Sequence, residues 1–293
     1  MQYGFSIKRK CYLLSVLLMT VWLTGCVQEE FESTPSPAGN GIRFTLTVPD
    51  VNLPSVSSRT MTGTGTAKKE DEIETVDILV FDMSKTPAVF LEWVSATGVT
   101  QDLADNSTVS FSAVLSPTTA STCIVVVANK ELDNIVSGFT KGATTKVEAM
   151  EKMLHTQTGK WLADGSTTGG YTRIPMYGEK VISKITPSMN PITEINMKRM
   201  LARIDIRNNS VTSNFMVEEV YLANYNTTGY IAPAWNTNGQ VTEPAPDTPV
   251  LPTGSGKMTE EGNAILYSVN GNTPYDGEIY TFESLAAGDA GGA

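Results

Sequence analysis

Short apolar runs separated by turn-forming residues recur along most of this chain, and they restrict it to folds built from β-strands. Residues 122–128 (TCIVVVA) are almost uniformly apolar and residues 74–82 (ETVDILVFD) nearly so, which indicates strands buried on both faces. Residues 42–48 (IRFTLTV) alternate apolar with polar side chains, the pattern of a half-buried strand. Further runs of one kind or the other are 88–94, 108–115, 192–207, 217–222, 230–231, 264–269 and 278–282. We therefore predict a mainly β protein of sandwich architecture.

One segment favours a helix instead. Thr145 and Glu148 have the spacing of a capping box, and the apolar residues that follow recur at helical intervals. Gly159 supplies a stop signal just beyond them. We therefore predict a helix over residues 145–157.

The N-terminus carries a secretory signal. A basic stretch precedes an apolar run of about a dozen residues, which is too short to span a hydrocarbon core of ~30 Å. The following motif, Leu-Thr-Gly-Cys, fits a lipobox, in which Gly25 precedes the cleaved bond and the thiol of Cys26 is acylated, as with palmitate. We predict that residues 1–25 are a lipoprotein signal peptide and that residues 26–40 are a solvated tether. The alternative is an ordinary signal peptide followed by a chance cysteine.

The net charge of the mature chain limits the classes of partner that it can bind. Removal of residues 1–25 leaves 18 Lys and Arg against 31 Asp and Glu, a formal charge of −13. Such a surface argues against nucleic acid as a partner, because phosphate binding requires basic side chains. It also argues against docking on an anionic membrane by charge, so the lipid on Cys26 would be the link to the outer membrane. Cys123 then remains within an apolar run, most simply as a small core residue.

The sequence offers no recognisable constellation of catalytic or metal-binding residues. Its one histidine, His155, lies within the predicted helix, and Cys123 lies within an apolar run, so neither fits a nucleophile–base pair. No His/Cys spacing fits zinc, no acidic run fits a calcium loop, and no glycine-rich loop fits phosphate. We therefore expect no enzymatic activity, no cofactor and no metal site.

Several motifs, taken in order along the chain, resemble the Bacteroidales fimbrillins, the shaft and accessory subunits of type V pili. Each motif is weak alone, and their common order and spacing make the resemblance fairly specific over nearly the whole chain. The matching segments are the lipobox at Cys26, 42–48, Ser58-Arg59-Thr60, 73–82, 125–130, 174–179, 199–206, 220–224 with Gly229, and 279–283.

The resemblance implies two tandem β-sandwich domains of the transthyretin-like Greek-key type, with one or two short helices. The N-terminal domain would cover residues 41–195 and the C-terminal domain residues 196–293. Family members have several more strands after the motif matched by residues 279–283, whereas this sequence continues with ten residues rich in Ala and Gly. We therefore expect an incomplete C-terminal domain: either the sequence is truncated, or the subunit lacks a donor strand and could occupy only a terminal position.

The resemblance also implies a mode of assembly. Fimbrillins are exported as lipoproteins, and an arginine-specific protease then cuts them. The cut removes the first strand, and the groove that its loss creates is filled by a strand of another fimbrial subunit. On this sequence the cut would fall between Arg59 and Thr60, and residues 41–59 would form the removable segment. The apolar residues of the removable strand would be Ile42, Phe44, Leu46 and Val48. Without the resemblance, Arg59 is an ordinary solvated loop residue.

Three functional hypotheses follow. The first is a structural subunit of a cell-surface fimbria that polymerises by donor-strand exchange and supports adhesion. The second is an unprocessed lipoprotein that anchors or terminates the fimbria. The third, of another class, is a surface glycan-binding β-sandwich lipoprotein, in which Trp93, Trp161 and Trp235 would supply sugar-stacking platforms.

Overall fold

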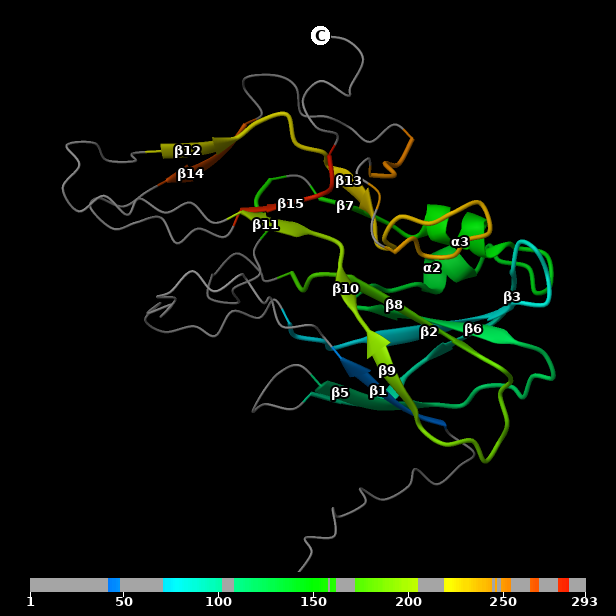
Figure 1. Cartoon of the computed structure of the whole chain (residues 1–293). Coiled ribbons are helices and arrows are strands. Elements are labelled where there is room, and N and C mark those ends of the chain that lie inside the picture. The colour runs from blue at the N-terminus through cyan, green and yellow to red at the C-terminus, as the bar shows by residue number, and fades with distance from the viewer. Residues whose placement is uncertain are drawn as a thin grey trace, which may run out of the picture. The chain divides into compact units, whose positions relative to one another are not determined.

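The apolar runs of the sequence fold as β-strands in the computed structural model of the chain (Figure 1). The structure describes residues 42–47, 71–101, 108–157, 159–161, 172–204, 219–243, 246, 249–253, 264–268 and 279–284. All of them belong to Asn40–Ala293, the second of the two units into which the chain divides. Strands predominate over helices within these residues, which confirms the expected mainly β fold. None of the described helices is long and apolar enough to cross a membrane.

Two large sheets dominate the described structure. The first has the strand order β10-β8-β6-β2-β3. Its strands are β2 (Val76–Asp82), β3 (Val89–Ser95), β6 (Thr122–Ala128), β8 (Met176–Ile182) and β10 (Lys198–Arg199). The second has the order β4-β5-β1-β9. Its strands are β1 (Ile42–Thr47), β4 (Thr97–Gln101), β5 (Thr108–Ala113) and β9 (Ile192–Asn196). Neighbouring strands in both sheets are antiparallel, except that β1 runs parallel to β9.

Smaller elements complete the described part of the chain. Three two-stranded antiparallel sheets pair β7 (Leu154–Thr156) with β13 (Thr228–Tyr230), β11 (Ala202–Ile204) with β15 (Ile279–Thr281), and β12 (Glu219–Leu222) with β14 (Ile265–Ser268). The helices are α2 (Asp133–Val136) and α3 (Lys146–Lys152).

The two large sheets bury one hydrophobic core between them. Side chains from β1, β5 and β9 meet side chains from β2, β6 and β8 across this layer. Fully buried members include Phe44, Leu46, Val109, Ile195, Ile78, Val80, Ile124 and Val126. Two sheets packed face to face over a shared apolar core form a β-sandwich, so the predicted architecture is confirmed.

The opposite face of the five-stranded sheet is buried as well. Leu79 of β2 and Val125 of β6 belong to a second core cluster together with Met150 of α3. The same cluster includes Trp161, Ile231, Tyr280 and Phe282. Figure 1 shows α3 on this side of the sheet, away from β1 and β5. Strands β2 and β6 are therefore enclosed on both faces, as their nearly continuous apolar sequences predicted.

The predicted helix is correct at its start and wrong at its end. Thr145 caps α3, and its side chain and that of Glu148 form the expected reciprocal capping box. The helix ends at Lys152, well before Gly159, because the next residues pair with β13 as strand β7. That partner lies more than 70 positions further along the chain, so local spacing could not reveal it.

Strand pairing joins residues on both sides of the expected domain boundary. Strand β9, at the boundary itself, pairs with β1, and β10 pairs with β8. Strand β13 pairs with β7. The division into residues 41–195 and 196–293 stays a prediction.

A buried ion pair sits between α3 and the five-stranded sheet. Lys146 is 1% exposed, and its Nζ lies 2.6 Å from Oε2 of Glu179 on β8. The hydroxyl of Tyr177 donates to the same carboxylate oxygen at 2.5 Å, and the backbone N–H of Val241 donates to its Oε1 at 3.4 Å. Burial and the neighbouring carboxylate raise the pKa of Tyr177 well above its usual value, so its hydroxyl stays protonated. The lysine charge is thus compensated within the fold.

Replacement of Lys146 tests how much the fold depends on this pair. In Lys146→Met the Glu179 carboxylate loses its cation in a largely buried site, which we expect to lower the free energy of unfolding by about 3 kcal/mol. Chemical denaturation followed by circular dichroism measures the change. Exposed Lys141→Met is the matched control and should shift the midpoint little. Equal stability of the two variants would show that the ion pair contributes nothing.

Candidate functional site

The first described strand lies in the interior of its sheet. Strand β1 pairs with β5 on one side, from Ile42 opposite Ala113 to Thr47 opposite Thr108. On the other side it runs parallel to β9, with Phe44 opposite Ile192. Strand β1 therefore provides the hydrogen-bonding partners of two other strands. We call the space between β5 and β9 that it fills the β1 slot.

Side chains of β1 reach the centre of the sandwich core. Phe44 and Leu46 are fully buried, and Ile42 is nearly so, while the residues between them point away from the core. The ring of Phe44 stacks on that of Phe111 with centroids 5.0 Å apart and planes 6° from parallel. The alternation predicted for residues 42–48 is confirmed for these three residues, and their removal with the strand stays a prediction. Val48 lies outside the described residues.

The β9 wall of the slot is held by β8. Gly178 of β8 leaves room for β9, since a Cβ there would lie 2.9 Å from Ile195 Cγ2 and 2.7 Å from Met197 Sδ. Lys180 of β8 donates from Nζ to the carbonyl oxygen of Thr193 at 2.5 Å. That contact steadies an irregularity in β9, where Glu194 has a φ of +61°. These contacts do not involve β1.

The β5 wall is held independently as well. Strand β4 pairs with β5 on the side away from β1, with Thr97 opposite Ser112 and Gln101 opposite Val109. The Thr97 hydroxyl adds a hydrogen bond to the Ser112 carbonyl oxygen at 3.3 Å. Both walls of the slot are therefore anchored by neighbours other than β1.

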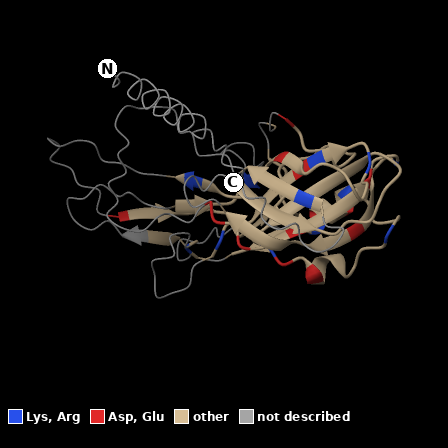
Figure 2. Ribbon diagram, turned by 90° about the horizontal axis from the view of Figure 1, so that it is seen from below, with Lys and Arg blue, Asp and Glu red and all other residues tan. Residues whose placement is uncertain are grey.

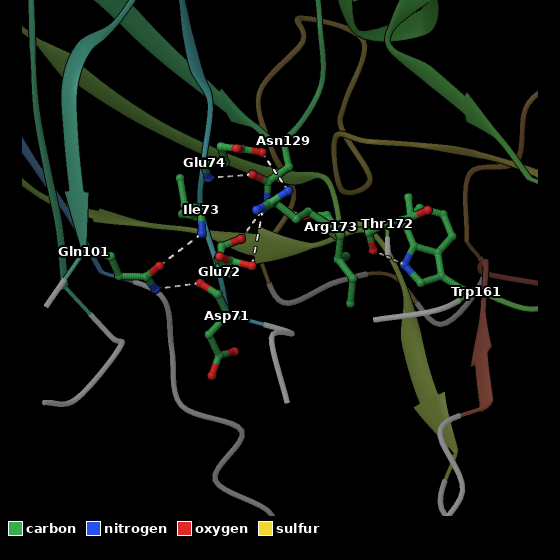
Figure 3. Close-up of polar contacts among 10 residues, drawn as sticks. Asp71, Glu72, Ile73, Glu74, Gln101, Asn129, Trp161, Thr172 and Arg173 are labelled. Carbon is green, nitrogen blue, oxygen red and sulfur yellow. Dashed lines mark hydrogen bonds and ion pairs between the residues drawn. The ribbon is translucent and has the colours of Figure 1, made fainter. Parts of the chain in front are cut away.

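Polar side chains hold residues 71–74, which lead into β2, and we call this set of contacts the 71–74 clasp (Figure 3). The side chain of Gln101 donates to the carbonyl oxygen of Asp71 at 2.7 Å and accepts from the N–H of Ile73 at 3.1 Å. Arg199 of β10 forms an ion pair with the Asp71 carboxylate. Side chains from β4 and β10 thus both bind Asp71, the first residue of this segment.

Asn129 and Arg173 complete the clasp from the other side (Figure 3). The Asn129 amide donates to the Glu72 carbonyl oxygen at 2.7 Å and accepts from the Glu74 N–H at 3.0 Å. It also donates to the Ile174 carbonyl oxygen at 3.0 Å. The Arg173 guanidinium lies 3.3 Å from the Glu72 carboxylate and 2.6 Å from that of Glu74. The entry to β2 is therefore fixed by contacts that do not include β1.

The sequence did not reveal the clasp. Its members come from five separate stretches, and each alone resembles an ordinary polar surface residue. The one local signal is Asn129, whose φ of +58° suits an asparagine at the end of an apolar strand. Of the other predicted site residues, Gly25, Cys26, Arg59 and Thr60 lie outside the described part of the chain, so their roles stay predictions.

Of the three tryptophans proposed as sugar-stacking platforms, the structure excludes one. Trp161 is 3% exposed and donates its indole N–H to the Thr172 carbonyl oxygen at 2.9 Å, so its ring cannot stack on a ligand. That part of the glycan hypothesis is wrong. Trp235 is half-buried and packs edge-on against Tyr230, with centroids 4.8 Å apart. Trp93, on β3, is also half-buried.

The histidine and the cysteine among the described residues differ in burial, since His155 is half-buried and Cys123 is fully buried. His155 packs against Trp161 at 4.9 Å between ring centroids, and its burial lowers its pKa to about 4, so the imidazole is neutral near pH 7. Cys123 is fully buried, which raises the pKa of its thiol to about 12. No cluster of three or more potential metal ligands occurs among the described residues. Figure 2 shows basic and acidic positions interspersed over the described strands and loops.

Comparison with known proteins finds one matching family model and several solved structures of weak similarity. The family model described as "Major fimbrial subunit protein (FimA)" matches residues 42–246. A fimbrial assembly protein from Parabacteroides distasonis is 10% identical, with 83% of this chain and 77% of that chain covered and a TM-score of 0.43. A candidate cell adhesion protein from the same organism is 16% identical, with 86% and 73% covered and a TM-score of 0.48. Both scores fall below 0.5, and we conclude nothing from these two structures. No curated protein sequence matches significantly.

Loss of the Asn129 side chain should loosen the clasp. Asn129→Ala removes three hydrogen bonds and places alanine at a positive φ, which we expect to cost about 2 kcal/mol of stability. Amide hydrogen exchange should accelerate most over residues 72–76. Exposed Asn134→Ala on α2 is the control and should leave exchange there unchanged. Unaltered protection of residues 72–76 in Asn129→Ala would contradict the clasp.

Proposed function

Because the chain belongs to the family of the major fimbrial subunit protein (FimA), we propose that it is a structural subunit of a cell-surface fimbria, exported as a lipoprotein and polymerised by exchange of its first strand. Family membership indicates a structural, non-enzymatic protein that associates with other fimbrial subunits. Lipidation at Cys26, cutting after Arg59 and strand exchange are the finer parts of the proposal.

The position of β1 carries the proposal. Loss of a strand at the edge of a sheet leaves one neighbour unpaired, whereas loss of β1 leaves both β5 and β9 without backbone partners on that side. It also uncovers the apolar core where Ile42, Phe44 and Leu46 sat, each of which contributes roughly 1.5–3 kcal/mol by burial. An incoming strand of alternating sequence satisfies both the backbone groups and the core.

The chain between β1 and the clasp explains why a cut would start the exchange. While residues 48–70 are intact, β1 is tethered to its slot, and its effective concentration is on the order of millimolar. A free strand from another subunit competes poorly with a tethered one. A cut after Arg59 turns β1 into a separate segment that can dissociate. The clasp then holds the new N-terminal part of the chain at the entry to β2.

Processing is tested by a conservative change at the cut. Arg59→Lys keeps the positive charge, and we expect it to prevent cutting by an arginine-specific protease and to abolish SDS-resistant oligomers. The readouts are N-terminal mass spectrometry and gels of unboiled samples. Arg43→Lys, within paired strand β1, is the control and should still yield chains that begin at Thr60. If the surface chains of the unaltered protein all begin at Cys26, the protein is instead an anchor or terminal subunit.

Lipidation is tested at Cys26, the first residue of the predicted tether. Cys26→Ala removes the thiol to be acylated, so metabolic labelling with an alkyne analogue of palmitate should be lost. Cys11→Ala, within the signal peptide, is the matched control and should retain the label. Equal labelling of both variants would contradict lipid attachment at Cys26.

A further inference from the structure

Phe44 occupies the most demanding position in the β1 slot. Its ring is fully buried at the middle of the strand and lies nearly parallel to the ring of Phe111, itself 2% exposed. Ile192 of β9 is its partner on the other side. A flat ring fills this space, whereas an aliphatic side chain loses the stacked contact and alanine leaves a cavity.

The walls also fix where along the incoming strand this ring must lie. Phe44 pairs with Ile192 and Leu46 pairs with Ile195, so β9 has an extra residue at Glu194 between the two pairs. Because Lys180 and Gly178 hold that part of β9 to β8, the irregularity does not depend on β1. A strand that slips by two residues moves its ring away from Phe111, and a slip by one residue turns it out of the core.

The inward positions on either side of Phe44 accept a wider range of side chains. Ile42 lies opposite the small side chain of Ala113, and Leu46 lies opposite Val109. Aliphatic side chains two residues to either side of the ring satisfy both sites. The intervening positions, 43, 45 and 47, point away from the core and tolerate polar residues.

We propose that the strand which replaces β1 belongs to another fimbrial subunit and carries a phenylalanine at the Phe44 position, with aliphatic residues two positions before and after it. This inference rests on the proposed strand exchange and adds the chemistry that selects the partner. The aromatic stack on Phe111 sets the register and discriminates between subunits whose strands alternate equally well. A released β1 segment fits the same slot, but it ends at the cut and has no domain through which a fimbria grows.

The test uses the full mature chain with a specific protease site placed within residues 50–58, so that its outcome does not depend on Arg59. After the cut, dye-labelled peptides with the sequence of residues 41–48 compete for the slot, and fluorescence anisotropy measures their affinities. One peptide is unchanged, and the others carry Phe44→Leu, Phe44→Ala or, as the outward-facing control, Thr45→Ala. The same series is measured on a chain with Phe111→Leu, whose folding is checked before the cut by circular dichroism.

We expect the Phe44→Leu peptide to bind roughly fivefold more weakly than the unchanged one and the Phe44→Ala peptide to bind on the order of a hundredfold more weakly. The Thr45→Ala peptide should bind within about twofold of the unchanged one. The Phe111→Leu chain should lose the preference for Phe44 over Phe44→Leu. Equal binding of the Phe44 and Phe44→Leu peptides to the unaltered chain would overturn the aromatic requirement and leave strand exchange standing. Binding of no peptide to the cut chain would overturn strand exchange itself.

Native partners supply the last arm of the test. The cut chain captures strands from purified subunits of the same fimbria, and mass spectrometry identifies the protected segment. A phenylalanine two residues from aliphatic neighbours supports the proposal. A captured strand with an aliphatic residue at that position, or capture of the released β1 segment alone, contradicts it.

Discussion

The insertion of one short strand between two others is the constraint on which the sandwich depends. Strand β1 supplies backbone hydrogen bonds to both β5 and β9, and its three inward side chains complete the core. Unpaired backbone groups and exposed apolar surface are both costly in water, so the slot is stable only when a strand of suitable pattern fills it. The fold thus requires a strand there, while the walls do not require that it come from the same chain.

That distinction rests on how the walls are anchored. Contacts at Gly178 and Lys180 hold β9 to β8, the β4–β5 pairing holds the other wall, and the 71–74 clasp holds the chain where β2 begins. The five-stranded sheet beneath is buried on both faces, with α3 and the Lys146–Glu179 pair on its far side. A fimbrial subunit that exchanges a strand needs this separation, because the remaining structure must keep the shape of the slot.

Much of the fold follows from local sequence. The alternation in residues 42–47 and the continuous apolar runs of β2 and β6 predicted both the strands and which of them are enclosed, and Thr145 with Glu148 marked the start of α3. Other elements had no local signal. The sequence of β7 continues the helical pattern of α3, and only its pairing with β13 makes it a strand. Strand β4 has too few apolar residues to be recognised from its sequence.

By itself, the sequence determined that the chain is mainly β and which side chains of its first strand face a core, because side-chain direction alternates at every residue of a strand. Only the tertiary structure decided that this strand lies inside a sheet rather than at its edge. It also decided that Phe44 stacks on Phe111 and that Asn129, Arg173 and Gln101 gather around residues 71–74. These features depend on which distant segments meet, and a local pattern of apolar and polar residues is the same whichever neighbour a strand acquires.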